Sequence, residues 1–183
     1  MSGLVLAAAA LALCGAAADP GEHALSVTSA SLAATTTPDG HRTAVYRVEF
    51  EFTEADMGAV RDDEAQVEVR VSDRDGHGGR HLLGDNLEDC RTAPDHSMRC
   101  PGGVVFEPVA GKPSRWHVAI SFRGRSPAVS FRGPVTVRFT YSVSGGPETV
   151  HVGSIASCKA ARGGATLTCR AKRHGEAPGS HGA

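Results

Sequence analysis

The sequence predicts an all-β fold, an antiparallel sandwich of two sheets with two local disulfides. Apolar and polar residues alternate strictly over several extended segments, which is the period of a half-buried strand. Turn clusters rich in glycine, proline and aspartate separate these segments. Four of the five cysteines fall into two pairs that are close in sequence, as expected for local disulfides.

Residues 1–18 have the pattern of a secretory signal peptide. Every residue from Leu4 to Leu13 is apolar, no charged residue precedes Asp19, and Ala16-Ala17-Ala18 fits a cleavage site. The fifteen residues from Leu4 to Ala18 are fewer than the about 20 that a membrane-spanning helix needs. We therefore expect a secreted or extracellular protein without a transmembrane span in its mature chain. A buried apolar helix is the alternative for this segment.

Cys14 gives an alternative location, in which the protein is a lipoprotein anchored at Cys14. The segment Leu11-Ala12-Leu13-Cys14 resembles the lipobox of bacterial lipoproteins, in which the cysteine is lipidated and becomes the first residue. This chain departs from that pattern at Leu13, where the family has a small residue. Either processing route removes Cys14 from disulfide pairing.

Eight segments are predicted strands of one domain over residues 24–170. Four alternate clearly, with Trp116 on an apolar face and expected in the core: Tyr46–Phe52, Val67–Val71, Trp116–Phe122 and Val135–Val143. Four are weaker: Ala24–Leu32, Val104–Phe106, Thr149–Ser157 and Ala165–Arg170. One apolar and one polar face per strand favour two sheets that each keep one face in water. Residues 54–65 allow one helical turn at most.

The two ends of the chain differ in composition from this domain. Residues 19–23 are predicted to be a short linker after the leader. Residues 171–183 contain no apolar side chain larger than alanine. Such a segment cannot bury enough apolar surface to offset its loss of conformational entropy, so we predict a disordered tail.

The cysteines after the leader are Cys90, Cys100, Cys158 and Cys169, for which three pairings are possible. Closing a short loop costs less entropy than closing a long one, so we predict Cys90–Cys100 and Cys158–Cys169. Each bond is expected to stabilise the fold by about 2–3 kcal/mol. A zinc site is the alternative, but neither pair has the C-x₂-C spacing.

The segment from Cys158 to Cys169, with its Gly163-Gly164 turn and Thr166-Leu167-Thr168-Cys169 ending, resembles the disulfide-closed hairpin of immunoglobulin-like repeat domains in bacterial surface proteins. The resemblance covers about a third of the chain and implies an immunoglobulin-like sandwich. Members of that family are usually spacers or adhesive modules. The chain departs from them because it lacks tandem copies and a wall-sorting signal. Its 16 Arg against 3 Lys favour a source among high-GC Gram-positive bacteria.

Two groups of residues are candidates for binding a metal. Asp73, Asp75 and Asp85 lie in an acidic segment that begins like a calcium loop, although the position of the bidentate glutamate falls on Gly84. His77, His81 and His96 offer imidazoles to zinc or copper. The alternatives are a solvated acidic loop and scattered exposed histidines, and we predict no cofactor.

Four arginines form a candidate ligand surface. The formal net charge is −1, which gives no reason to expect a nucleic-acid partner. Arg123, Arg125, Arg132 and Arg138 lie on or near two predicted strands. If they share a face, they can bind an anionic cell-wall polymer or membrane head groups. The alternative is a solvated polar face.

The sequence contains no motif of a known catalytic site. The G-x-S-x-G elbow is absent, and Asp62-Asp63-Glu64 is a charged segment typical of a solvated loop. We therefore predict a non-catalytic binding or structural module, secreted or associated with the envelope, whose partner is a cell-wall polymer or another extracellular protein. The alternative is a small hydrolytic sandwich protein or a protease inhibitor, with Thr92–Met98 as its inhibitory loop.

Overall fold

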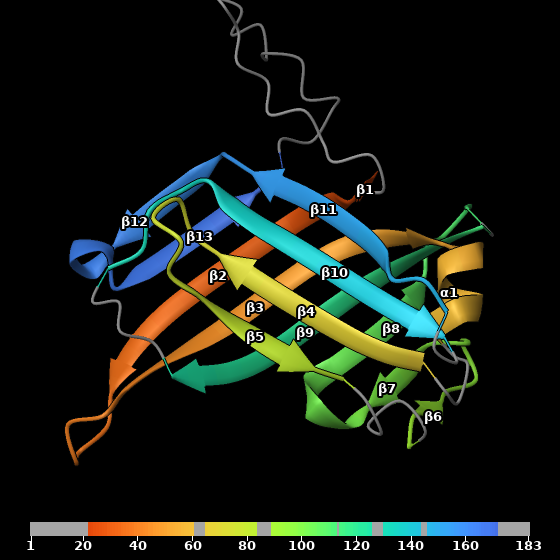
Figure 1. Ribbon diagram of the computed structural model, residues 1–183, viewed down its shortest axis with the longest axis horizontal. Helices are drawn as coiled ribbons and strands as arrows, with labels where there is room; N and C mark the ends of the chain where they lie inside the picture. Colours follow the sequence, from red (N-terminus) through yellow and green to blue (C-terminus); the bar gives the residue numbers. More distant parts are fainter. Residues whose placement is uncertain are drawn as a thin grey trace, which may run out of the picture.

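Two β-sheets pack face to face in the computed structural model, which describes residues 22–60, 65–83, 89–112, 114–125, 130–143 and 146–171 (Figure 1). Within these residues the five-stranded sheet has the order β1 (Glu22–Ala24), β11 (Thr149–Ile155), β10 (Val135–Val143), β4 (Ala65–Ser72) and β5 (Gly78–Leu82). The eight-stranded sheet has the order β12 (Cys158–Ala161), β13 (Thr166–Arg170), β2 (Ser26–Thr36), β3 (Arg42–Thr53), β9 (Arg115–Arg125), β8 (Val104–Pro108), β7 (Met98–Cys100) and β6 (Arg91–Thr92). The predicted all-β, two-sheet sandwich is confirmed.

Strand β3 supplies much of the core because its alternate side chains all point between the sheets. Tyr46, Phe50 and Phe52 are at most 2% exposed. Phe52 makes an edge contact with Phe139 of the facing sheet, with ring centres 4.5 Å apart. Trp116 is 7% exposed, so its expected place in the core is confirmed. Burial of each such side chain stabilises the fold by about 1.5–3 kcal/mol.

Both predicted disulfides are present. Cys158 and Cys169 are register partners on β12 and β13, joined by the short 3₁₀ turn η3 (Arg162–Gly164). Gly163 and Gly164 in that turn have φ angles of 64° and 91°, which glycine adopts at little cost. The second bond joins Cys90 to Cys100, just before the turn η2 (Pro101–Gly103).

The segment that joins β3 to β4 contains more helix than the single turn expected from the sequence. Helix α1 (Glu54–Val60) has seven residues, about two turns. Thr53 and Asp56 form a capping box: the Asp56 N–H donates to Thr53 Oγ1 at 3.3 Å, and the Thr53 N–H donates to Asp56 Oδ2 at 3.2 Å. Met57 and Val60 are buried, so the helix covers one end of the core.

The domain also begins earlier than residue 24. Glu22 and His23, in the predicted linker 19–23, belong to β1, which pairs with β11 in parallel. This is the one parallel pair among the described strands, and all the other pairs are antiparallel, as expected. At the other end, the Ala171 N–H donates to the Thr28 carbonyl at 2.9 Å, so Ala171 still contacts the sheet. The predicted signal peptide 1–18, Cys14 and residues 172–183 lie outside the described residues.

No helix in the described ranges combines the length and the apolar character that crossing a membrane requires.

Replacing Cys158 and Cys169 together with alanine is expected to lower the free energy of unfolding by about 3 kcal/mol, because the bond closes a loop in the unfolded chain. Replacing Cys90 and Cys100 should have an effect of similar size, since the two sequence separations are 11 and 10. Urea denaturation of each double variant measures both values. A loss below about 0.5 kcal/mol for either pair would contradict the expectation.

Candidate functional site

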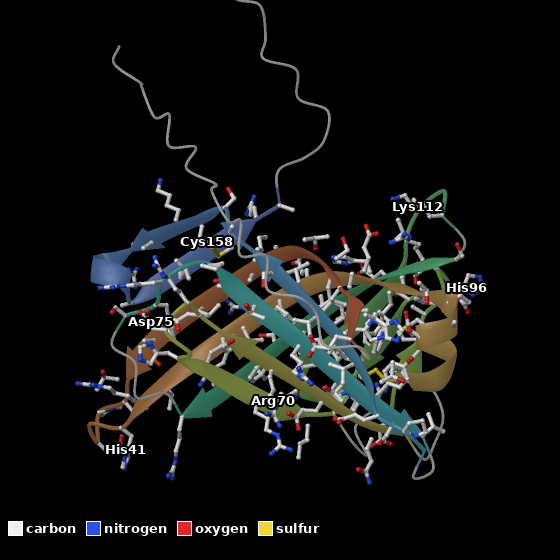
Figure 2. The ribbon with its side chains drawn as sticks, turned by 45° about the horizontal axis from the view of Figure 1, so that its top comes forward. His41, Arg70, Asp75, His96, Lys112 and Cys158 are labelled. Atoms are coloured by element: carbon white, nitrogen blue, oxygen red, sulfur yellow. A yellow bond between two sulfur atoms is a disulfide. The ribbon has the colours of Figure 1, made fainter. Side chains whose placement is uncertain are left out.

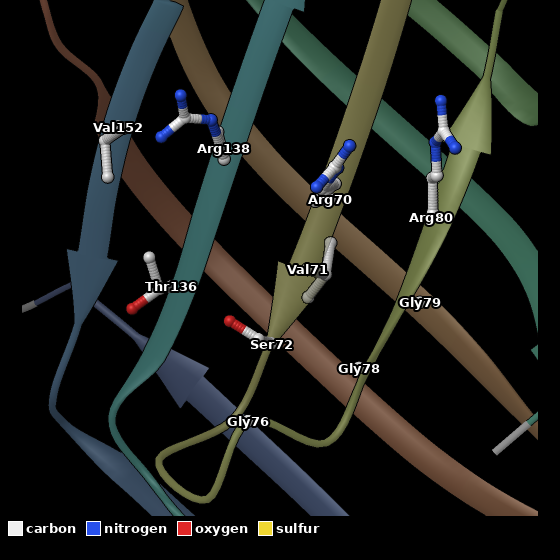
Figure 3. Close-up of a pocket in the computed structure, with 10 residues that line it drawn as sticks. All are labelled: Arg70, Val71, Ser72, Gly76, Gly78, Gly79, Arg80, Thr136, Arg138 and Val152. Carbon is white, nitrogen blue, oxygen red and sulfur yellow. The ribbon is translucent and has the colours of Figure 1, made fainter. Parts of the chain in front are cut away.

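Three arginines lie side by side on the outer face of the five-stranded sheet. Arg138 on β10 is the register partner of Arg70 on β4, and Arg70 is the partner of Arg80 on β5. The valines beside Arg70 and Arg138 point into the core, so these two arginines point to solvent, as does Arg80, the register partner of Arg70. Figure 3 shows the three side chains in a row across three strands. Adjacent strands are about 4.8 Å apart, which brings three positive charges close together.

Two carboxylates hold these arginines in place. Glu68 accepts from Nε of Arg70 and, at 2.6 Å, from Nε of Arg80, while Glu22 accepts from Nη1 of Arg138. Burial acts to raise the pKa of Glu68, but the hydrogen bonds and charges of Arg70 and Arg80 outweigh it and lower the pKa. Glu68 is therefore ionised at neutral pH. The Arg70 side chain is 59% exposed, so a ligand can reach its guanidinium group, on which the charge of Glu148 also acts.

A cleft of about 490 Å³ lies over the arginine row. Ser72 and Thr136 add hydroxyls to its lining, and Gly78 and Gly79 form part of its floor. A side chain at position 78 would lie 2.0 Å from the Val71 carbonyl oxygen, so only glycine fits there. We call these residues together the arginine cleft. Guanidinium groups with free N–H donors bind carboxylate and phosphate groups through paired hydrogen bonds.

Of the four predicted ligand-surface arginines, only Arg138 lines this cleft. Arg123 and Arg125 are on β9, on the outer face of the other sheet, and Arg132 precedes β10. The four therefore do not form one surface. Arg70 and Arg80 were missed, although Arg70 is an outward position of a correctly predicted strand. The missing information was strand order, because the row exists only when β10, β4 and β5 are neighbours.

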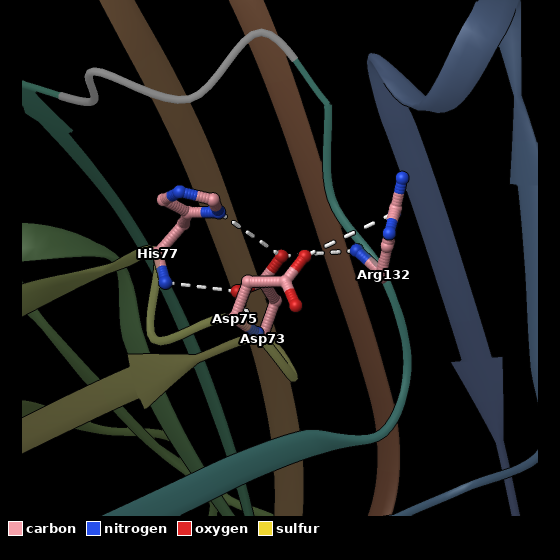
Figure 4. A network of polar contacts seen from close by, with 4 residues as sticks. All are labelled: Asp73, Asp75, His77 and Arg132. Atoms are coloured by element: carbon pink, nitrogen blue, oxygen red, sulfur yellow. Dashed lines mark hydrogen bonds and ion pairs between the residues drawn. The ribbon is translucent and has the colours of Figure 1, made fainter.

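Asp73, a predicted metal ligand, is 4% exposed and organises the turn between β4 and β5 (Figure 4). Its Oδ1 accepts the N–H groups of Asp75 at 3.0 Å and His77 at 2.8 Å. Its Oδ2 accepts the N–H of Arg132 at 2.9 Å, which ties the turn to the segment before β10. The side chain thus satisfies three backbone donors that would otherwise lack a partner.

This turn brings two of the three predicted acidic ligands together. Ligand atoms of Asp73, Asp75 and His77 lie within 4.8 Å of one another, whereas Asp85 lies outside the described residues. The Asp73 oxygens are already occupied by backbone N–H groups, and Arg132 Nε is 3.9 Å from Asp75 Oδ2. A cation here would have to displace those donors and tolerate the guanidinium. The geometry therefore favours a turn-forming role.

The predicted histidine group is dispersed. His81 stacks on Phe122 with ring centres 5.1 Å apart, and His77 belongs to the Asp73 turn. His96 lies in the turn between β6 and β7, at the end of the sandwich opposite to Asp75 (Figure 2). The three imidazoles do not converge on one site.

The candidate inhibitory loop, Thr92–Met98, is a closed hairpin between β6 and β7. The Ala93 N–H donates to the Ser97 carbonyl at 2.8 Å, and the His96 N–H donates to the Ala93 carbonyl at 2.9 Å. Asp95 Oδ1 accepts from the N–H and hydroxyl of Ser97 at 3.0 Å and 2.7 Å. Backbone donors used inside the hairpin are not free to pair with a protease, so this geometry does not favour inhibition.

Two histidines have environments that disfavour their charged forms. Burial lowers the pKa of His81 below its ordinary value. Burial also lowers the pKa of His151, and the neighbouring His23 adds to this, although Asp56 opposes it. Both imidazoles are therefore neutral at neutral pH, and folding resists their protonation.

Replacing Asp73 with alanine should lower the free energy of unfolding by about 3 kcal/mol, because three backbone N–H groups lose their acceptor. Replacing the exposed Asp75 is the matched control and should cost less than about 1 kcal/mol. Urea denaturation with and without Ca²⁺ tests both claims. If Ca²⁺ stabilises the wild type and the Asp73 variant loses that gain, the calcium hypothesis is correct and the turn-forming role is insufficient.

Stability should fall as the pH drops below the ordinary histidine value of 6.5, since the unfolded chain then binds protons that native His81 and His151 resist. We expect a lower free energy of unfolding at about pH 5.5 than at about pH 7.5, measured by urea denaturation with EDTA present. His81→Gln should reduce this difference, whereas His41→Gln, at an exposed position, should not. A stability that is flat or rises toward acid pH would argue against neutral buried imidazoles.

Comparisons with known proteins give no relative from which a function can be transferred. No protein-family model, no curated protein sequence and no solved structure matches the chain.

Proposed function

We propose that this protein is a non-catalytic binding module, secreted or associated with the cell envelope, which holds an anionic cell-wall polymer against the arginine cleft. The observation that carries the proposal is the register of Arg138, Arg70 and Arg80 across three adjacent strands. Like charges placed directly opposite each other destabilise a sheet unless something neutralises them. Glu68 and Glu22 pair with these arginines, and the charge of Glu148 also acts on Arg70. The arginine side chains nevertheless stay 42–59% exposed, so an anionic ligand reaches their guanidinium groups and binds in competition with the carboxylates.

The two disulfides support a location outside the cytoplasm. Both disulfides are local and lie at the margins of the eight-stranded sheet. Disulfides persist in oxidising compartments and are rare in the cytosol. Together with the predicted signal peptide, they support export, either as a free secreted protein or with a lipid anchor at Cys14.

A binding role is supported over an enzymatic one by the chemistry of the cleft. Its described lining consists of arginines, hydroxyl groups, glycines and two valines. None of these lining residues is a histidine or a carboxylate that could serve a hydroxyl as general base. We also propose that the domain is related to immunoglobulin-like surface modules. The short disulfide-closed hairpin of β12 and β13 supports it.

A cell-wall pull-down tests the proposal. The double variant Arg70→Gln/Arg138→Gln should bind purified Gram-positive cell walls at least about tenfold more weakly than wild type, because each charge-assisted hydrogen bond contributes about 1.5–3 kcal/mol. The matched control is Arg123→Gln/Arg125→Gln, which removes the same charge from the opposite sheet and should change affinity less than about twofold. Sedimentation of the protein with walls, at low and high salt, measures binding.

Cell walls stripped of phosphodiester-linked polymers show which anionic group the protein binds, the phosphate of such a polymer or the carboxylates of the remaining wall. Loss of binding after stripping identifies a phosphate polymer, and retained binding identifies the carboxylates of the remaining wall. Equal loss in both double variants would mean that only net charge matters and would overturn the assignment to this cleft. Absence of binding to any wall preparation would overturn the function itself.

A further inference from the structure

The outward side chains of the five-stranded sheet form rows that run across the strands. Register places each outward side chain beside its partner on the next strand, and outward positions along one strand are about 6.5 Å apart. The row formed by Arg138, Arg70 and Arg80 therefore has a neighbouring row on each side. One of these rows carries carboxylates and the other carries hydroxyl groups, so the two sides of the arginine row differ in chemistry.

The carboxylates lie on one side of the arginine row. Glu68 is two residues before Arg70 on β4, and its register partner on β10 is Thr140. On the next strand the partner of Thr140 is Val150, and Val150 pairs in turn with Glu22 of β1. Both carboxylates bond to the arginines from this side. An anionic polymer meets like charge here, so this side disfavours its passage.

Hydroxyl groups lie on the other side of the arginine row. Thr136 on β10 is the register partner of Ser72 on β4 and of Ser154 on β11, and we call these three residues the hydroxyl row. On β10 and β4 the hydroxyl row is two residues from the arginine row, and Thr136 and Ser72 line the cleft (Figure 3). This side is neutral, and its groups both donate and accept hydrogen bonds.

The hydroxyl row keeps hydrogen-bonding capacity for a ligand. Thr136 Oγ1 and Ser154 Oγ are 2.9 Å apart, and either atom can be the donor. A hydroxyl group has one proton to donate and two acceptor positions, so the group that accepts in this pair still has its own proton for a ligand. Ser154 is exposed, and Thr136 and Ser72 are half-buried. Val152 also lines the cleft and offers an apolar contact to C–H groups.

A ligand that complements both rows has an anionic group and, about 6–7 Å to one side of it, neutral hydroxyl groups. Phosphodiester-linked polyols have this chemistry, and so do polymers of uronic acids. Polyphosphate has the charge without the hydroxyl groups. The hydroxyl row therefore distinguishes among anions that the arginines alone bind equally.

We propose that the arginine cleft binds a polymer whose repeating unit carries hydroxyl groups beside its anionic group, and that Thr136, Ser72 and Ser154 determine this specificity. The inference rests on the proposed function, because the arginines must first hold the anionic group. The carboxylates on one side and the hydroxyl row on the other give the ligand one orientation. Its hydroxylated part lies toward the end of β4, where Ser72 is the last residue of the strand.

Calorimetric titration with three oligomers of equal charge tests the hydroxyl row. The oligomers are a glycerol phosphate polymer and a polyuronate, which carry hydroxyl groups, and polyphosphate, which does not. Whichever hydroxylated oligomer the wild type binds more tightly identifies the anionic group as phosphate or carboxylate. Ser72→Ala/Thr136→Val should weaken binding of that oligomer at least about fivefold, because two hydrogen bonds are lost, and should weaken binding of polyphosphate less than about twofold.

The matched control is Thr168→Val/Ser31→Ala, which removes the same two hydroxyl groups from a register pair on the outer face of the eight-stranded sheet. It should change the binding of none of the three oligomers. If Ser72→Ala/Thr136→Val weakens polyphosphate as much as the hydroxylated oligomer, or weakens neither, the hydroxyl row does not determine specificity and the inference is overturned.

Failure of the inference is distinguishable from failure of the proposed function. If the wild type binds none of the three oligomers, or if Arg70→Gln/Arg138→Gln binds them as tightly as the wild type, the cleft is not an anion site and both proposals fall. If the arginine variant loses binding of all three oligomers while the hydroxyl variant does not discriminate among them, only the specificity is wrong.

Discussion

Burial of apolar side chains between the two sheets is the constraint on which the other features of this protein depend. Along β3, the side chains of Tyr46, Phe50 and Phe52 point into the interior. Phe139 on β10 of the facing sheet packs against Phe52. Because side chains alternate along a strand, filling the interior also decides which residues face water. The arginine row is a direct consequence of this rule. Arg70 and Arg138 face outward because the valines beside them face inward, and Arg80 faces outward as the register partner of Arg70.

Two aspartates stabilise opposite ends of the sandwich by the same kind of contact. Asp73 accepts three backbone N–H groups and closes the turn between β4 and β5, whereas Asp56 caps α1 at the other end (Figures 1 and 2). The difference between them is how many oxygens the backbone uses. Both oxygens of Asp73 bind N–H groups, while one oxygen of Asp56 faces Tyr141 and His151. Both oxygens of Asp56 also accept hydrogen bonds, and the side chain therefore joins α1 to the five-stranded sheet.

The two faces of the five-stranded sheet carry different groups. The arginine cleft is on its wet face and suits an extended anionic ligand, since its donors are spread over three strands. On the other side of the same sheet, Asp56 of α1 contacts Tyr141 and His151. Disulfides at the margins of the other sheet stabilise the fold without occupying the arginine cleft.

The sequence alone determined the fold class, the strands and the disulfides, because these depend on local patterns. Alternation in Tyr46–Phe52 identified both the strand and its buried face, and short spacing paired Cys158 with Cys169. Strand order, and with it the arginine cleft, was decided only by the tertiary structure. Arg70 and Arg138, or His23 and His151, are neighbours through pairing of strands distant in sequence. Arg123 and Arg138 are close in sequence yet belong to opposite faces. The physical reason is that a period of two residues fixes which way each side chain points but not which strand lies beside it.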